Sequence, residues 1–258
     1  MIFKVLSYIK FLFTSTNHHG VHSPFVFKLV TQCLYAKNNA KDVRAFTCYK
    51  KFHLKNKKAI KVTDFGAGST IFRSNERPIH KIAKYAGIST KRAKLLMRVV
   101  SYFQSKNILE FGTSLGLATT ALHLGNTESK IITLEGCPNT ANEAKKLFQS
   151  YQLNNIQVTI GEFTNSLKRI ENNDVFDLVY FDGNHQKQAT LTYFEFCLQH
   201  IHNDSVFIFD DIHWSNDMEE AWRIIKNNPR VTVTIDTYQW GFVFFRKEQE
   251  KEHFIIRV

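Results

Sequence analysis

The sequence has few cysteines and no pair of them at the spacing that binds zinc. Cys33, Cys48, Cys137 and Cys197 are scattered over the 258 residues and form no Cys-x-x-Cys motif. A zinc ribbon or a secreted scaffold held by disulfides would need closely spaced cysteines, so the pattern argues against both. We therefore expect reduced thiols in a cytoplasmic protein.

Long apolar runs are also missing. No stretch reaches the roughly 18 uncharged apolar residues that a membrane span requires. The apolar residues 1–15 are interrupted by Lys4 and Lys10, and no small-residue cleavage site follows them. We expect neither a signal peptide nor a transmembrane helix. The helical spacing of the apolar residues predicts a helix that docks on the body of the protein, and it leaves open a peripheral membrane contact through 1–15.

Acidic residues are scarce in the first part of the chain. Residues 1–107 hold 21 Lys and Arg against 3 Asp and Glu, a net charge of +18, whereas residues 108–258 hold 13 against 20, a net charge of −7. A basic half can bind RNA, an anionic membrane or a phosphorylated substrate, or it can pack beside the acidic half. No RNA-binding motif accompanies the charge, so nucleic acid is the less favoured partner.

Hydrophobic periodicity predicts an α/β fold. Seven strands are expected, at 106–111, 130–135, 156–160, 176–182, 205–210, 231–236 and 241–246. Helical patterns separate the first six, which is typical of a doubly wound, Rossmann-like parallel sheet with helices on both faces. Only TYQW separates the last two strands, so the seventh strand should return antiparallel. We expect residues 1–85 to form a basic, mainly helical extension or substrate cap, and 86–258 to form the main domain.

Two glycine-containing stretches compete for the role of cofactor loop. A nucleotide loop of this fold needs a preceding strand, a following helix, and an acid about 20 residues later at the end of a second strand. VTDFGAGST, residues 62–70, is followed by no second strand and no such acid. ILEFGTSLG, residues 108–116, is followed by a predicted helix and by the strand KIITLE, whose Glu135 lies 23 residues beyond Gly112. The second stretch is therefore the predicted cofactor loop.

The composition of that loop distinguishes between cofactors. A dinucleotide loop carries a middle glycine so that the backbone can approach a pyrophosphate, but Ser114 stands there, between Gly112 and Gly116. S-adenosylmethionine has no phosphate, and it carries a ribose diol that Glu135 can accept. The loop therefore favours S-adenosylmethionine.

At this point residues 85–258 resemble the class I S-adenosylmethionine-dependent methyltransferases. ILEFGTSLG resembles motif I, IITLEG the ribose-binding segment, VTIGEF the segment near the adenine, and FDLVYFDGNH motif IV. The resemblance implies strand order 3-2-1-4-5-7-6. FDGNH followed by FIFDDIHW is most similar to metal-dependent small-molecule O-methyltransferases. The cofactor-binding residues implied are Glu110, Gly112, Thr113, Ser114, Gly116, Glu135, Gly161, Glu162 and Asp182.

Three acids are predicted to end neighbouring strands. Asp182 follows the fourth strand, and Asp210 and Asp211 end the fifth, so all three should reach the carboxyl edge of the sheet. Such an oxygen-rich set suits Mg²⁺, and the metal-dependent relatives carry acids at the matching places. Without a metal, Asp182 could bind the methionine moiety or a substrate hydroxyl, and Asp211 could cap the next helix.

His185 is the predicted general base. It follows Asp182 by three residues, an arrangement similar to the one in sugar O-methyltransferases, where the histidine is thought to take the hydroxyl proton. Methyl transfer from a sulfonium needs a positioned nucleophile and removal of that proton. The alternative is a surface histidine at the start of a helix. His213, just after Asp211, is a second and weaker candidate.

Two further motifs remain outside this scheme. The segment 62–70 could fold over the cofactor crevice as part of a substrate wall, with Asp64 and Ser69 as polar contacts, or it could be an ordinary tight turn. The histidines in HHGVHSPF, with no acid nearby, indicate a turn before a helix that Ser23 caps and Pro24 begins.

The functional prediction is an S-adenosylmethionine-dependent methyltransferase that methylates a small-molecule hydroxyl with help from a divalent metal. One alternative is an RNA methyltransferase that uses the basic half, although motif IV lacks an Asn-Pro-Pro-Tyr type signature. Another is a non-catalytic scaffold that binds S-adenosylmethionine. A homodimer is compatible with the sequence, which does not name the methyl acceptor.

Overall fold

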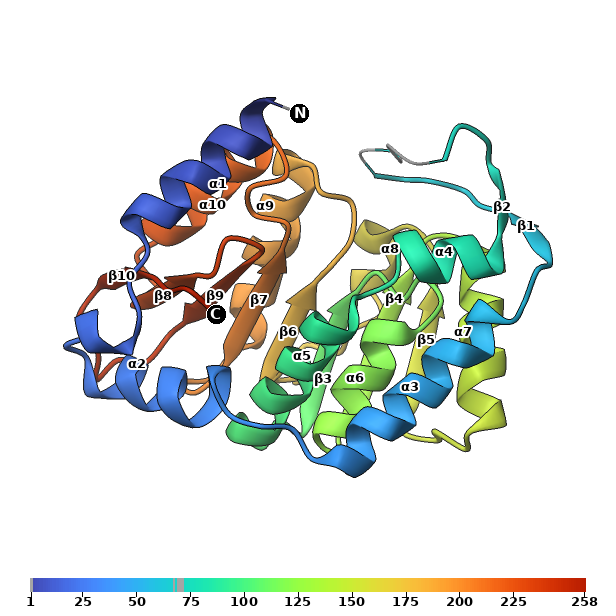
Figure 1. The fold of residues 1–258 in the computed structure, drawn as a ribbon, viewed down its shortest axis with the longest axis horizontal. Coiled ribbons are helices and arrows are strands. Elements are labelled where there is room, and N and C mark those ends of the chain that lie inside the picture. The colour runs from blue at the N-terminus through green and yellow to red at the C-terminus, as the bar shows by residue number, and fades with distance from the viewer. Residues whose placement is uncertain (1, 67, 69–71) are drawn as a thin grey trace. The chain divides into compact units, whose positions relative to one another are not determined.

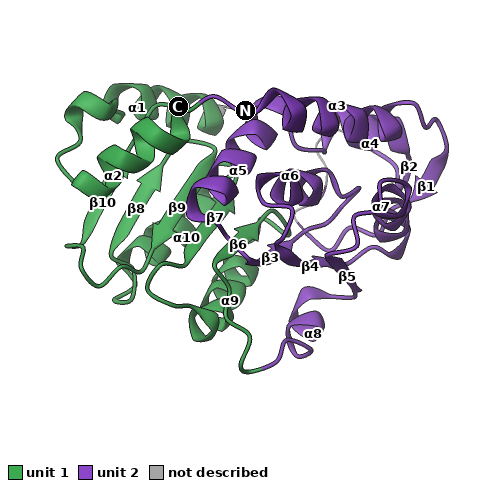
Figure 2. Ribbon diagram, turned by 90° about the horizontal axis from the view of Figure 1, so that it is seen from below, with its two compact units in different colours: residues 1–36, 172–258 green, residues 37–171 purple. Residues whose placement is uncertain are grey.

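The computed structural model describes residues 2–66, 68 and 72–258. It divides into two compact units, shown in different colours in Figure 2. The central unit comprises residues 37–171, and the terminal unit comprises residues 1–36 together with 172–258. The domain boundary at 85/86 stays a prediction.

The central unit contains three parallel strands in the order β3-β4-β5. They are β3 (Asn107–Phe111), β4 (Lys130–Glu135) and β5 (Ile156–Ile160). The crossovers between them are α6 (Leu117–Gly125) and α7 (Pro138–Ser150) (Figure 1). These are the first three predicted strands, in the predicted order, because each strand–helix repeat returns the chain to the same side of the sheet.

Helices and a short hairpin complete the central unit. The helices are α3 (Ala40–Leu54), α4 (Ile79–Tyr85), α5 (Thr90–Phe103) and α8 (Phe163–Leu167). The hairpin pairs β1 (Ala59–Lys61) with β2 (Glu76–Pro78) in antiparallel fashion. Sequence analysis treated residues 62–70 as a loop or a turn and did not predict this pairing. Two strands of three residues, of which only β1 alternates between exposed and buried positions, give too weak a pattern to be found.

The terminal unit contains the remaining strands of the fold. They are β6 (Leu178–Phe181), β7 (Val206–Asp210), β8 (Val233–Asp236), β9 (Trp240–Phe244) and β10 (Glu252–Ile255). β6 and β7 are parallel, whereas β9 is antiparallel to both β7 and β8. The predicted hairpin and the order 4-5-7-6 are confirmed by the order β6-β7-β9-β8. Every residue of β6 and β7 is buried, which suits a sheet with both faces covered.

One described strand of the terminal unit was not predicted. β10 lies parallel to β8 at the end of the sheet, so the described residues of the terminal unit hold one strand more than expected. It follows a charged stretch, and its residues are exposed or half-buried. An edge strand of this kind lacks the apolar alternation that sequence analysis detects. The fold class itself, an α/β Rossmann-like sheet with one antiparallel strand, is confirmed.

The first 36 residues pack within the terminal unit. They form α1 (Ile2–Thr14), a 3₁₀ turn at His18–Gly20, and α2 (Pro24–Leu29), which continues as a π-helical turn over Val30–Leu34. The Ser23 side chain accepts a hydrogen bond from the N–H of Val26, and Pro24 occupies the first turn, so the predicted turn and helix start are confirmed. The two remaining helices are α9 (Lys187–Cys197) and α10 (Asn216–Asn227).

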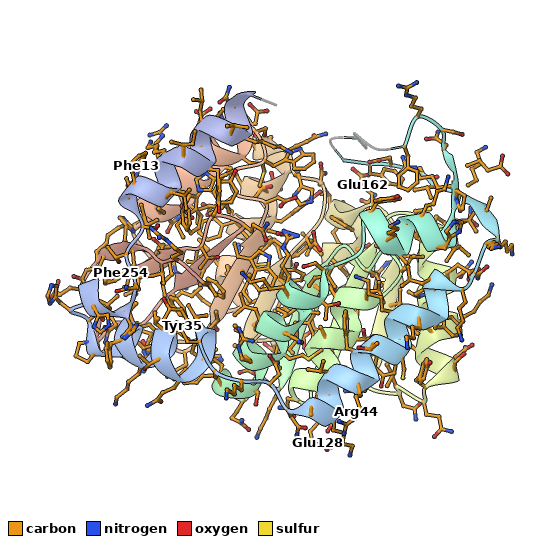
Figure 3. The ribbon with its side chains drawn as sticks, in the orientation of Figure 1. Phe13, Tyr35, Arg44, Glu128, Glu162 and Phe254 are labelled. Carbon is orange, nitrogen blue, oxygen red and sulfur yellow. The ribbon has the colours of Figure 1, made fainter. Side chains whose placement is uncertain are left out.

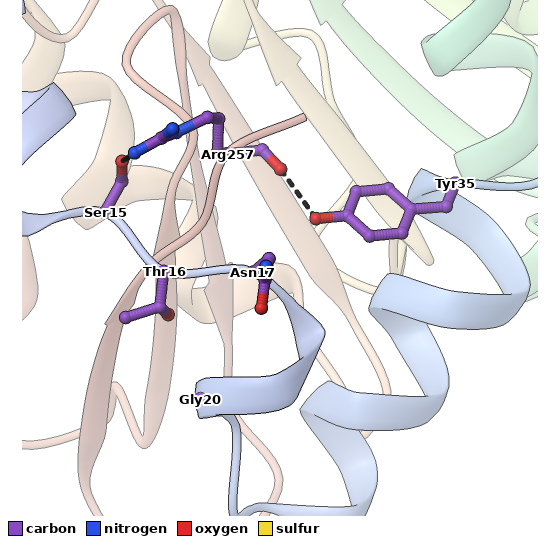
Figure 4. A pocket seen from close by; sticks show the side chains of 6 residues that line it. All are labelled: Ser15, Thr16, Asn17, Gly20, Tyr35 and Arg257. Carbon is purple, nitrogen blue, oxygen red and sulfur yellow. Dashed lines mark hydrogen bonds between the residues drawn. The ribbon is translucent and has the colours of Figure 1, made fainter.

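The beginning and the end of the chain are joined by backbone hydrogen bonds. The N–H of Thr16 donates to the Ile255 carbonyl at 2.9 Å, and the N–H of Arg257 donates to the Thr16 carbonyl at 2.9 Å. The Arg257 guanidinium also donates to Ser15 Oγ, and the Tyr35 hydroxyl donates to the Arg257 carbonyl at 2.7 Å (Figure 4). These contacts hold the segment after α1 against the C-terminal segment.

Candidate active site

Three strand ends meet at one edge of the central unit. The N–H groups of Gly112 and Thr113 both donate to the Leu134 carbonyl, at 2.9 and 3.1 Å, and the N–H of Gly161 donates to the Glu135 carbonyl at 2.9 Å. The loop after β3, the acid that ends β4 and the glycine after β5 are therefore neighbours. The predicted cofactor-binding residues of this unit gather there because parallel strands present their carboxyl ends on the same side.

The loop after β3 turns tightly through three residues with positive φ. Gly112, Ser114 and Gly116 have φ of 97°, 49° and 78°. Gly116 is required twice, for its positive φ and because a Cβ would stand 2.6 Å from Phe148 of α7. The loop is therefore shaped both for its own turn and for close packing of α7.

Glu135 is tied to this loop by its carboxylate. Oε2 accepts from the N–H of Ser114 at 2.6 Å, and Oε1 accepts from the N–H of Cys137 at 2.8 Å. Burial raises the pKa of Glu135, while the two N–H groups act in the opposite direction. The residue is partly exposed, so its carboxylate can also accept hydroxyl groups. A partly exposed carboxylate beside this glycine loop fits a ribose diol.

Glu110 lies deeper than the other predicted cofactor residues. It is fully buried, and its Oε2 accepts from the hydroxyls of Thr119 and Thr133 at 2.5 and 2.6 Å. Thr113 joins the cluster through a 2.6 Å contact between its hydroxyl and that of Thr133. Burial raises the pKa of Glu110 to about 7, against the lowering effect of the threonine hydroxyls. This cluster supports the loop from within.

Glu162, in contrast to the buried Glu110, lies at the surface. It is exposed and precedes α8, and its side chain makes no capping hydrogen bond to that helix (Figure 3). It follows Gly161 at the same edge of the sheet. Its predicted contact with the cofactor stays a prediction.

The hairpin of β1 and β2 is attached to the turn that carries Glu135. The N–H of Thr63 contacts Cys137 Sγ at 3.3 Å, and Asn139 Nδ2 donates to the Lys61 carbonyl at 2.7 Å. A Cβ on Gly136 would stand 2.7 Å from the ring of Phe65, so this ring lies directly against Gly136. Phe65 is nevertheless 52% exposed.

The charge of Asp64 raises the pKa of Glu135, which indicates that the two carboxylates are near each other. Asp64 accepts the N–H of Gly66 at 3.1 Å, as the alternative of an ordinary turn predicts, and it pairs with Arg77 at 3.4 Å. Ser69, the second predicted polar contact, lies outside the described residues. Sequence analysis did not single out Phe65, since no local pattern indicates which distant glycine a ring will contact.

The terminal unit brings the predicted catalytic pair together. His185 Nε2 lies 3.7 Å from Asp182 Oδ1, and both side chains are about a quarter exposed, at 25% and 24%. The Tyr180 hydroxyl donates to Asp182 Oδ2 at 3.3 Å. Asn184 and His185 both have positive φ, 73° and 40°, and α9 begins only at Lys187. The left-handed backbone of this turn therefore returns the imidazole towards Asp182.

The predicted metal ligands are not arranged as a metal site. Asp182 follows β6, and Asp210 ends β7 and accepts the N–H of Asp211 at 2.8 Å. Asp211 has φ of 54° and does not cap the next helix, because Ser215 caps α10 through the N–H of Met218. Within residues 2–66, 68 and 72–258, no three His, Cys, Asp or Glu side chains form a group that could hold a metal ion.

His213 takes part in an ion-pair cluster that sequence analysis missed. Nδ1 lies 2.7 Å from Glu219 Oε1, and Nε2 lies 2.8 Å from Asp236 Oδ2. Burial alone would lower the pKa of His213, but the two carboxylates outweigh it and raise the pKa. With both ring nitrogens engaged, His213 has none left to accept a substrate proton. In the sequence, the one indication of this cluster is that Asp236 is an acid at the end of a predicted strand.

A cavity of about 410 Å³ lies elsewhere in the terminal unit (Figure 4). Its lining residues are Ser15, Thr16, Asn17, Gly20, Tyr35 and Arg257. None of them is a predicted site residue.

Comparison with known proteins agrees with this geometry. Residues 109–212 match a family described as a methyltransferase domain. This region spans the strands β3 to β7 and so includes the cofactor loop, Glu135, Asp182 and His185. No curated protein matches the chain.

Solved structures share the fold at low sequence identity. An O-methyltransferase from Bacillus cereus in complex with SAH is 22% identical with a TM-score of 0.54, covering 85% of this chain and 95% of that one. An SAH-bound methyltransferase from Podospora anserina is 17% identical with a TM-score of 0.57, covering 82% and 98%. The O-methyltransferase TomG from Streptomyces achromogenes, involved in tomaymycin synthesis and in complex with SAM, is 15% identical with a TM-score of 0.56, covering 83% and 92%.

The domain match and the shared fold confirm the resemblance inferred from the sequence. Residues 109–212 match a methyltransferase domain, and the chain shares its fold with SAH- and SAM-bound methyltransferases. In the part of the chain that the structure describes, no helix is long and apolar enough to cross a membrane.

Proposed function

We propose that the protein methylates a hydroxyl group of a small molecule and that it binds S-adenosylmethionine at the edge of the central unit. The observation that carries the cofactor assignment is the Glu135 carboxylate, which the N–H groups of Ser114 and Cys137 hold while it remains partly exposed. S-adenosylmethionine supplies an electrophilic methyl group on a sulfonium sulfur. Glu135 accepts the ribose hydroxyls, and the positive-φ loop from Gly112 to Gly116 lies beside the methionine portion.

The hairpin of β1 and β2 adds a wall to this cofactor site. Phe65 rests on Gly136, next to Glu135, and still exposes half of its surface. An aromatic face at this place suits a planar ring such as adenine. Asp64 adds a second carboxylate near Glu135. The contact proposed for Phe65 is apolar, and the polar contacts of Asp64 and Ser69 stay predictions.

We assign proton removal to His185. The imidazole takes the hydroxyl proton as the acceptor oxygen forms its bond to the methyl carbon, and the electrons of the broken carbon–sulfur bond stay on sulfur. The Asp182 carboxylate, 3.7 Å from Nε2, stabilises the imidazolium that results.

The proposed proton removal and methyl transfer use no metal ion. Metal assistance would require Asp182, Asp210 and Asp211 to converge on one point, and the described side chains form no such group. We therefore expect turnover to survive EDTA within about twofold, because His185 alone can accept the proton. Loss of turnover in EDTA and its recovery with Mg²⁺ would contradict this part of the proposal and restore the three acids as ligands.

The experiment that tests the function is a release assay for S-adenosylhomocysteine over a panel of phenols, catechols and sugar alcohols. For any acceptor found, His185→Gln should lower kcat by about 100-fold or more and leave the Kd for S-adenosylmethionine unchanged. His202→Gln, an exposed histidine paired with Asp177, is the matched control and should keep full turnover. Equal turnover of wild type and His185→Gln would show that His185 is not the base.

A further inference from the structure

The outer face of α1 is apolar although the helix is already docked. Six of the fourteen large apolar side chains that are exposed in the described residues belong to this one helix. They are Val5, Leu6, Tyr8, Ile9, Leu12 and Phe13. Phe13 is 87% exposed, and Figure 3 shows it pointing away from the terminal unit. A surface helix of a globular protein ordinarily turns charged or polar residues to solvent, so this face departs from the rule.

The inner face of α1 accounts for its docking. Ser7 and Phe11 are buried, and the Ser7 hydroxyl donates to Glu219 Oε1 at 2.5 Å. The Tyr238 ring lies 5.5 Å from Phe11, and its hydroxyl donates to the Lys4 carbonyl at 2.8 Å. Leu6, Ile9 and Phe13, spaced three and four residues apart, lie on the opposite side of the helix. Sequence analysis treated docking and membrane contact as alternatives, whereas opposite faces of one helix can serve both.

The charge of this part of the chain favours an anionic partner. α1 carries Lys4 and Lys10 and no acid, and the first acid in the sequence is Asp42. The acid Glu220 on α10 is already paired with Lys187 at 2.9 Å.

Lys4 is turned to the docked side, with Nζ 2.8 Å from the centre of the Trp214 ring, which leaves Lys10 as the cation of this helix beside the exposed face. A second copy meeting the first through this face would bring two Lys10 side chains together with no acid on the helix to balance them. An anionic surface complements Lys10.

We propose that α1 docks the protein on an anionic lipid surface. The exposed apolar side chains enter the boundary between headgroups and acyl chains, with the helix parallel to the surface. Lys10 lies at the edge of the exposed face and meets the lipid phosphates. The inference does not depend on the identity of the acceptor.

The test is co-sedimentation of the full chain with vesicles of phosphatidylcholine that contain about one third phosphatidylglycerol. The wild type should sediment with these vesicles and not with pure phosphatidylcholine. Ile9→Ser combined with Phe13→Ser should lower partitioning by about tenfold or more. Leu54→Ser combined with Tyr85→Ser is the matched control, since both side chains are exposed apolar residues of the central unit. Lys10→Glu should weaken binding less, by about threefold to tenfold.

Circular dichroism and thermal melting should show that all variants fold like the wild type. The proposal would be overturned if the wild type did not sediment, or if it sedimented equally with neutral vesicles. It would also be overturned if the Ile9 and Phe13 substitutions abolished a concentration-dependent dimer in the absence of vesicles, because a second copy would then be the occupant. Binding of RNA through this face without vesicle binding would equally contradict it.

Discussion

The two units build their polar sites over very different distances along the chain. In the central unit, Ser114 and Glu135 are 21 residues apart, and Glu110 and Thr119 only 9. In the terminal unit, Ser7 and Glu219 are 212 residues apart, and Lys4 and Tyr238 are 234 apart. The central site follows from consecutive strand–loop–helix repeats, whereas Ser7 and Lys4 of α1 reach their partners in the terminal unit only in the folded protein.

The chemistry of the two sites differs accordingly. The central unit satisfies Glu135 with backbone N–H groups, which leaves a carboxylate available to a ligand. In the terminal unit, the His213 imidazole pairs with both Glu219 and Asp236. The charges of this cluster are therefore paired with one another. We therefore propose that the Glu135 carboxylate serves binding, whereas the carboxylates around His213 serve stability. The predictions below test this division.

The largest effect is expected for Glu135→Ala. Loss of the carboxylate removes two charge-assisted hydrogen bonds to the ribose, which should weaken S-adenosylmethionine binding by about 100-fold or more. Isothermal titration measures the Kd directly. Glu128→Ala, which removes an exposed acid of the same unit, is the control and should bind like the wild type. Equal affinity of wild type and Glu135→Ala would place the cofactor elsewhere.

His213→Ala should be the most destabilising change in the terminal unit. It leaves Asp236 and Glu219, whose side chains are 11% and 35% exposed, without their shared cation, which should cost about 2–3 kcal/mol. Urea unfolding measures the loss. The more exposed pair of His202 and Asp177 provides the control, and His202→Ala should cost less than about 1 kcal/mol. If both variants lost the same amount, the His213 cluster would not be the stabilising element.

Glu110→Gln tests the buried acid of the central unit by its pH dependence. The pKa of Glu110 rises from 4.5 to about 7 in the folded state, so folding favours its protonated form. The wild type should therefore lose stability as the pH rises through this range, and a glutamine, which stays neutral, should not. Relative to wild type, the variant should gain about 1–2 kcal/mol between about pH 5 and pH 8. Parallel stability curves for the two proteins would contradict this expectation.

The smallest effect is expected for Phe65→Ala. Loss of an aromatic face beside Gly136 should weaken S-adenosylmethionine binding by about threefold to tenfold. Tyr85→Ala removes another exposed aromatic side chain of the same unit and should leave the Kd unchanged. An unchanged Kd for Phe65→Ala would return the segment 62–70 to the ordinary turn that was its alternative.

Much of the central unit could be predicted because its signals are local. The bounds of β4 and β5 agree with the predicted strands 130–135 and 156–160, and Gly112, Gly116 and Glu135 meet as their spacing predicts. The hairpin in the terminal unit was predicted because four residues between two strands leave no room for a crossover helix. The Asp182–His185 contact also lies within a single turn of chain.

What the sequence by itself determined is therefore the repeat of strands and helices, the loop after β3 and the acid that ends β4. Only the tertiary structure decided that β10 joins the sheet, that Phe65 lies on Gly136, and that His213 is held between Glu219 and Asp236. It also decided that Asp182, Asp210 and Asp211 form no group for a metal. Spacing along the chain encodes neighbours within one strand–helix repeat. Contacts between distant segments depend on side-chain packing and charge, which spacing does not reveal.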